Sequence, residues 1–150
     1  MLLIPVVAFA EACVGIGLLV SGFILVAIAS LLYSSEIASL AQMLPLAFAG
    51  AMLGDHAGFY AGRWIGPGFH HTKFASKYQK GLSRAEDLIR RHGSAAIFIG
   101  RFIPAIRSLI PALLGIGAFN RLRYTVLDGL ACLLWTAALG GIVLGTSNLF

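Results

Sequence analysis

Residues 100–117 read GRFIPAIRSLIPALLGIG, an apolar stretch that carries two arginines and two prolines. Each arginine at bilayer depth costs about 2.5 to 3.5 kcal/mol on insertion scales, and each proline removes a helical hydrogen bond. Irregular, charged backbone at that depth is stable only against protein or a wet cavity. The stretch therefore predicts Arg101 and Arg107 inside an anion-handling membrane protein. The alternative is that both arginines extend to the lipid headgroups.

Composition indicates an integral membrane protein. The 150 residues are 59% hydrophobic and 11% charged, and the mean hydropathy is +0.89, whereas soluble domains contain roughly 25% charged residues. We predict an all-α, polytopic fold in a single domain, residues 1–150, with no room for a separate soluble catalytic module. The start, MLLIPVVAFAEACVG, lacks the basic region and cleavage site of a signal peptide, so we expect it in the mature protein.

The basic residues are distributed unevenly. None of the eleven precedes Arg63, and seven lie between Arg63 and Arg91. By the positive-inside rule, residues 63–91 face the cytoplasm, and so does the start of the last apolar run, 124–147, which follows two arginines. The stretch between these clusters, about 94–119, then begins and ends on one side. It is predicted to be a re-entrant hairpin, with Pro104 and Pro111 shaping its turn.

The first apolar run, residues 2–33, contains a single charge, Glu11. About 32 residues exceed the 17 to 25 that one span needs, and small residues, among them Gly22, gather at the centre. We interpret it as a second hairpin; the alternative is a short re-entrant piece up to about Gly17 followed by a span.

The middle of the chain completes the predicted layout. Residues 42–66 are predicted to span the membrane. Residues 70–91 have apolar side chains spaced among lysines and arginines, which is typical of an amphipathic helix on an anionic lipid surface.

A weak internal repeat relates the two hairpins. Shifting the sequence by about 90 residues places Glu11 on Arg101 and Gly22 on Ala112. Each copy would be a hairpin followed by a span, entering from opposite sides, which is an inverted-topology repeat. Because three unpaired charges at bilayer depth are unfavourable, we expect Glu11 to pair with Arg101 or Arg107.

Three motifs resemble those of a known family. They are GDHAGFYAGRWIG at 54–66, RHG at 91–93 and the RFxPxxRxxxP pattern that begins at Arg101. Together they resemble the DedA family, also called the SNARE-associated or VTT-domain family, over nearly the whole chain, from Phe9 to about Trp135. The resemblance implies a lipid transporter with two facing re-entrant loops. Bacterial members are linked to recycling undecaprenyl phosphate across the inner membrane, and eukaryotic relatives to phospholipid scrambling.

The resemblance also suggests roles for individual residues. Glu11 matches the family's membrane acidic residue, Asp55 the acid of the GD motif, and Arg101 and Arg107 the paired arginines. The chain departs from the pattern where several members carry a second acid, because Phe23 stands there. That departure weakens any scheme in which two carboxylates couple transport to protons.

The resulting hypothesis is a flippase or scramblase for a lipid phosphate, such as undecaprenyl phosphate or a phospholipid. Arg101 and Arg107 would bind the phosphate, since arginine's planar fork suits phosphate oxygens. Glu11 and Asp55 would couple transport to protons or act as permanent ion-pair partners, Asp55 with Arg63 eight residues on. Pro104, Pro111 and Gly22 would shape the hairpins.

Other classes of function remain open. Asp128 is a lesser candidate, expected near the interface. The four histidines lack metal-ligand spacing, and no metal, other cofactor or nucleic-acid partner is expected. We do not expect an enzyme, because Ser108 is the hydroxyl near the arginines and has no base beside it in sequence. The alternatives are a membrane scaffold acting through protein partners, or a lipid-phosphate enzyme. Bacterial inner-membrane localisation is expected, and a homo-oligomer is left open.

Overall fold

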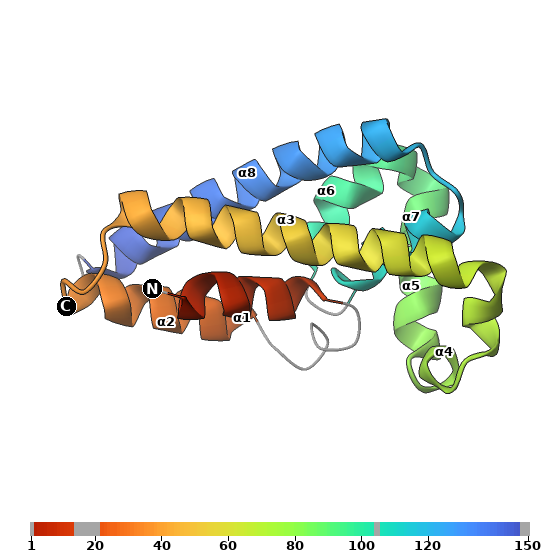
Figure 1. Cartoon of the computed structure of the whole chain (residues 1–150), viewed down its shortest axis with the longest axis horizontal. Coiled ribbons are helices and arrows are strands. Elements are labelled where there is room, and N and C mark those ends of the chain that lie inside the picture. The colour runs from red at the N-terminus through yellow and green to blue at the C-terminus, as the bar shows by residue number, and fades with distance from the viewer. Residues whose placement is uncertain (1, 14–21, 104–105, 148–150) are drawn as a thin grey trace.

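The computed structural model describes residues 2–13, 22–103 and 106–147, and these ranges are helical without a strand. This confirms the predicted all-α class. The helices are α1 (Leu3–Ala12), α2 (Gly22–Ser34), α3 (Leu40–Ile65), α4 (Lys73–Lys77), α5 (Gln79–His92), α6 (Ala96–Arg101), α7 (Leu109–Ile116) and α8 (Arg121–Ser147), with 3₁₀ turns at Gly66–His71 and Gly93–Ala95. The long helices α3 and α8 run in opposite directions (Figure 1).

Two helices exceed the length that a membrane requires. At 1.5 Å per residue, α3 and α8 are each roughly 40 Å long, against about 30 Å of hydrocarbon. Among the described helices, the segment Arg121–Thr146 of α8 combines this length with sufficient apolarity, at a mean hydropathy of 1.9. The predicted span at 124–147 is therefore present as a helix, and the predicted span at 42–66 is a single helix with a more polar sequence.

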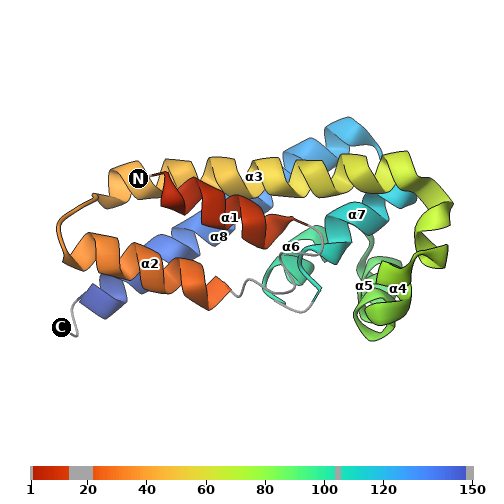
Figure 2. The same cartoon turned by 60° about the horizontal axis from the view of Figure 1, so that its bottom comes forward.

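Glycines on α3 let two shorter helices approach it closely. A Cβ at Gly54 would lie 2.7 Å from the Phe9 carbonyl oxygen of α1, and a Cβ at Gly62 would overlap the backbone of Ala112 in α7. In α7, Gly115 is pressed in the same way against the α3 backbone at Phe59. As a result α1 lies along the first half of α3 and α7 along the second half (Figure 2).

The N-terminal apolar run forms two short helices instead of one long one. With 10 and 13 residues, α1 and α2 are about 15 and 20 Å long, so neither crosses the hydrocarbon alone. The turn that we predict between them falls in residues 14–21, outside the described residues. Gly22 is the first residue of α2, and its hairpin-shaping role stays a prediction.

Two details of the predicted layout are wrong. Residues 70–91 do not form one surface helix, because Thr72 ends the 3₁₀ turn and caps α4, accepting from the Ala75 N–H at 3.2 Å. The apolar side of α5, including Leu82, packs into a protein core with α7. Pro111 does not shape a turn either: it lies in the first turn of α7, where proline's missing N–H is tolerated. Pro104 lies outside the described residues.

Candidate functional site

Arg101, the last residue of α6, meets two carboxylates from the long helices. Its Nη1 donates to Asp55 Oδ2 of α3 at 2.5 Å and to Asp128 Oδ1 of α8 at 3.3 Å. The three side chains are 4%, 1% and 1% exposed. Because removing one partner of a buried pair leaves an uncompensated charge, this triad ties α3, α6 and α8 together.

Arg107 forms a second buried ion pair beside the first. It lies in the turn before α7, and its Nη1 donates to Glu11 Oε1 of α1. Both side chains are buried. The prediction that Glu11 pairs with one of the two arginines is confirmed, although 96 residues separate the partners.

In both arginines, one edge of the guanidinium group has no hydrogen-bond partner among the described residues. In each, Nη1 is engaged by a carboxylate, while the buried Nε and Nη2 have no hydrogen-bond partner among the described residues. The Nε–H and one Nη–H of arginine form the planar fork that grips a carboxylate or phosphate. The site therefore presents two unused forks, an arrangement that is costly in a buried position unless a ligand is bound.

The guanidinium groups of both arginines lie over the ring of Trp135 in α8. Its ring centre lies 4.7 Å from the guanidinium carbon of Arg107 and 5.8 Å from that of Arg101. Cation–π attraction is strongest for tryptophan and strengthens away from water. The half-buried indole thus covers both cations.

The space at the site is small. The cavity between the charged groups measures about 10 Å³ and is lined by Asp55, Ile97, Arg101, Arg107, Ile110, Pro111, Tyr124 and Asp128. That is about the volume that admits one water molecule, and far below what a phosphate group needs. Anything much larger than a water molecule therefore fits only if the surrounding helices separate.

One sequence-based assignment at the site is wrong, and one is incomplete. Arg63 does not pair with Asp55; its Nη1 donates to the Phe119 carbonyl oxygen at 3.0 Å. Asp128, expected as a lesser candidate, is 1% exposed and paired with Arg101. Separations along the chain do not reveal which helices pack together, so neither contact could be predicted from the sequence.

Trp135 and His56 also belong to the site, although neither was expected there from the sequence. The sequence did contain a clue to the site residues on α8. Asp128, Cys132 and Trp135 are four and three residues apart, so they lie on one face of a helix. His56 contacts Asp128, with 3.4 Å between Nδ1 and Oδ2.

Metal binding at this cluster competes with an arginine. Asp55, Asp128 and Cys132 offer three ligand atoms within 4.8 Å of one another. The Arg101 guanidinium already donates to both carboxylates, so the positive charge that they require is supplied by the protein.

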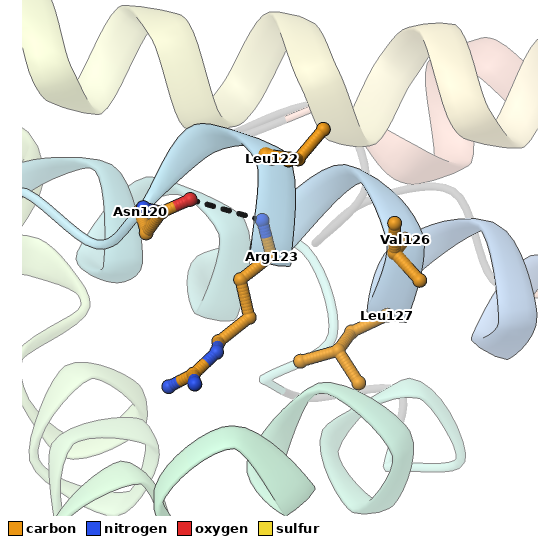
Figure 3. Close-up of a pocket in the computed structure, with 5 residues that line it drawn as sticks. All are labelled: Asn120, Leu122, Arg123, Val126 and Leu127. Carbon is orange, nitrogen blue, oxygen red and sulfur yellow. Dashed lines mark hydrogen bonds between the residues drawn. The ribbon is translucent and has the colours of Figure 1, made fainter.

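A larger, open groove of about 560 Å³ lies at the start of α8 (Figure 3), lined by Asn120, Leu122, Arg123, Val126 and Leu127. Asn120 caps the helix, its Oδ1 accepting from the Arg123 N–H at 3.1 Å. The groove contains none of the site's paired charges.

The VTT domain matches residues 2–144 of the chain. The inner membrane protein YqjA of Escherichia coli is 31% identical over 116 residues, which cover 73% of this chain and 51% of YqjA. YabI of the same bacterium is 27% identical over 133 residues (88% and 52%), and YghB of Salmonella typhimurium 29% identical over 138 residues (86% and 61%). No solved structure matches the chain significantly.

The chain belongs to the VTT-domain family, the DedA family of membrane proteins. These relatives are named inner membrane proteins, and the chain is accordingly a bacterial inner-membrane protein. It spans about half the length of YqjA and YabI.

Proposed function

We propose that this chain carries a lipid phosphate across the inner membrane, with Arg101 and Arg107 holding the phosphate. The observation that supports this most strongly is the pair of unused guanidinium forks, buried side by side over Trp135. Their Nη1 atoms stay with Asp55 and Glu11, so a ligand can be bound while both arginines keep these two partners.

The chemistry of the forks matches a phosphate headgroup. A phosphomonoester offers three terminal oxygens and one to two negative charges, and two forks offer four N–H donors and two positive charges. Crossing hydrocarbon is prohibitive for such a group in isolation. The protein would need to shield the headgroup alone, while the isoprenoid or acyl tail stays in the bilayer.

The helix arrangement is consistent with the alternating access that transport requires. Two sets of short, short and long helices occur in the same chain order: α1, α2, α3 and then α6, α7, α8. The long members run in opposite directions (Figure 1). We take α1–α2 and α6–α7 as two re-entrant hairpins of an inverted repeat, with residues 63–91 on the cytoplasmic side. Opening between the repeats would enlarge the 10 Å³ cavity.

Trp135 provides a direct test of headgroup binding. The chain has two tryptophans, and Trp64 is 91% exposed, so a Trp64→Phe protein reports through Trp135. We expect short-chain phosphatidic acid to change its emission, and short-chain phosphatidylcholine to do so much less.

In that background, Arg107→Lys keeps the charge but removes the fork. It should weaken phosphatidic acid binding roughly tenfold, about 1.4 kcal/mol, because one charge-assisted hydrogen bond is lost. The matched control is Arg91→Lys, at an exposed position on α5. Equal binding by Arg107→Lys and the parent would refute phosphate recognition by this fork and favour the scaffold function. Release of inorganic phosphate during titration would favour the enzyme.

A further inference from the structure

His56 connects the buried charge cluster to the outside of the helix bundle. It follows Asp55 on α3, and its side chain is 19% exposed, against 1% for Asp128. Its Nδ1 lies 2.9 Å from the Met52 carbonyl oxygen and 3.4 Å from Asp128 Oδ2. Its Nε2 lies 3.2 Å from Thr125 Oγ1. One imidazole thus contacts the site on one side and the bundle surface on the other.

Both ring nitrogens face hydrogen-bond acceptors. Around Nδ1 these are a carbonyl and a carboxylate oxygen. At Nε2, the Thr125 hydroxyl donates its hydrogen to the Arg121 carbonyl oxygen at 2.9 Å, which leaves its lone pairs toward the ring. A histidine that donates from both nitrogens is the positively charged form.

The charge balance of the cluster favours the same form. Glu11, Asp55 and Asp128 supply three negative charges, and Arg101 and Arg107 supply two positive ones. A positive His56 makes the cluster neutral. An anionic headgroup on the Arg101 fork would be repelled by the Asp128 carboxylate, which shares Arg101, and this repulsion disappears if Asp128 takes up a proton.

We propose that His56 is the proton donor that neutralises Asp128 when a phosphate binds the arginines; this rests on the proposed function. The Nδ1–H bond breaks, an O–H bond forms at Asp128 Oδ2, and the ring is left neutral with its hydrogen on Nε2. Asp128 becomes a neutral acid, and the Arg101 charge becomes available to the phosphate. When the phosphate leaves, the proton returns to Nδ1. His56 is a positioning residue in this scheme, acting through Asp128.

The surroundings of His56 allow its titration to be isolated. The titratable groups that contact or electrostatically influence His56 are Asp55 and Tyr60 from α3 and Tyr124 and Asp128 from α8. Arg101 of α6 and Cys132 of α8 contact Asp128, and Arg121 lies over Tyr60. Arginines stay charged, and tyrosines ordinarily neutral, near neutral pH. A pH dependence that disappears with the imidazole therefore belongs to the His56–Asp128 pair.

The test measures binding of short-chain phosphatidylglycerol by Trp135 emission in the Trp64→Phe protein, between about pH 5.5 and 8.5. A phosphodiester keeps one charge throughout this range, so the ligand does not contribute to the profile. We expect affinity to fall roughly tenfold as pH rises through the histidine range. His56→Gln should bind weakly and without this dependence, and the exposed His71→Gln should follow the parent.

A second variant tests the same role if the His56→Gln protein does not fold. Thr125→Val keeps the imidazole but removes the acceptor of Nε2–H, so the midpoint of the profile should move to lower pH. If His56→Gln folds and its binding has the same pH dependence as the parent, the role of His56 is overturned while phosphate binding stands. If His56→Gln misfolds, the same pH dependence in Thr125→Val has this meaning. Absence of binding of both phosphatidylglycerol and phosphatidic acid at every pH overturns the proposed function and this inference together.

Discussion

Asp128→Asn is expected to tighten phosphate binding, although it removes a buried ion-pair partner. Arg101 is shared between two carboxylates, at 2.5 Å from Asp55 and 3.3 Å from Asp128. Asparagine is isosteric with aspartate, and its Oδ1 can still accept from Nη1. The change therefore removes one negative charge from the cluster without emptying the space.

The size of the effect follows from the geometry. A phosphate on the free Nε and Nη2 edge of Arg101 would lie roughly 7 Å from the Asp128 carboxylate, across the width of one guanidinium group and two hydrogen bonds. At an effective dielectric constant of about 20, the repulsion between unit charges at that distance is about 2 kcal/mol. Its removal corresponds to roughly thirtyfold tighter binding.

The assay is titration of the Trp64→Phe protein with short-chain phosphatidylglycerol at about pH 8, where the histidine proton is least available. Asp87→Asn is the matched control, because Asp87 pairs with Arg90 on an exposed part of α5 and its charge is screened by solvent. Equal or weaker binding by a folded Asp128→Asn protein would refute the electrostatic reasoning and assign Asp128 a purely structural role.

Two further predictions concern the fold. Gly115→Ala should lower the free energy of unfolding by roughly 1 to 3 kcal/mol, because its Cβ would lie 2.9 Å from the Arg63 backbone nitrogen; Gly141→Ala, with nothing within 4 Å, should raise it by roughly 0.5 to 1 kcal/mol. Denaturant unfolding in detergent micelles, followed by circular dichroism, measures both, and equal stability of the two variants would contradict the close α3–α7 packing. Cysteines at Ser94 and Asn120, in a protein lacking its two native cysteines, should react with an impermeant reagent from the same side; labelling from opposite sides would exclude the re-entrant hairpin.

The sequence predicts those site residues that are charged but lie inside apolar stretches. Arg101 and Arg107 stand out because charges in an apolar stretch need a partner, and Glu11 stands out for the same reason. The cost of unpaired charges in the bilayer predicts that Glu11 pairs with one of the two arginines, but it does not say which one. The structure supplies that choice, since α1 packs along α3 and brings Glu11 to Arg107.

The rest of the site depends on contacts between helices that the sequence leaves open. Asp128 is close in sequence to two arginines, Arg121 and Arg123, but its partner in the structure is Arg101 of α6, which packs against α8. His56 is one residue from a predicted site residue, yet its link to Asp128 requires the packing of α3 on α8. The amphipathic pattern likewise does not show the helix breaks at Thr72, which caps α4, and at Tyr78.

The central claim is that the two arginines together hold the phosphate of a lipid as it crosses the membrane. The most direct measurement is the rate at which a phosphorylated isoprenoid lipid becomes accessible on the outer leaflet of proteoliposomes containing the parent protein, Arg107→Lys, Arg101→Ala or Arg107→Ala. We expect the parent to accelerate crossing, Arg107→Lys to slow it and either alanine variant to slow it further, with Arg91→Lys unchanged. Parental rates in correctly folded Arg101→Ala and Arg107→Ala proteins would contradict the claim.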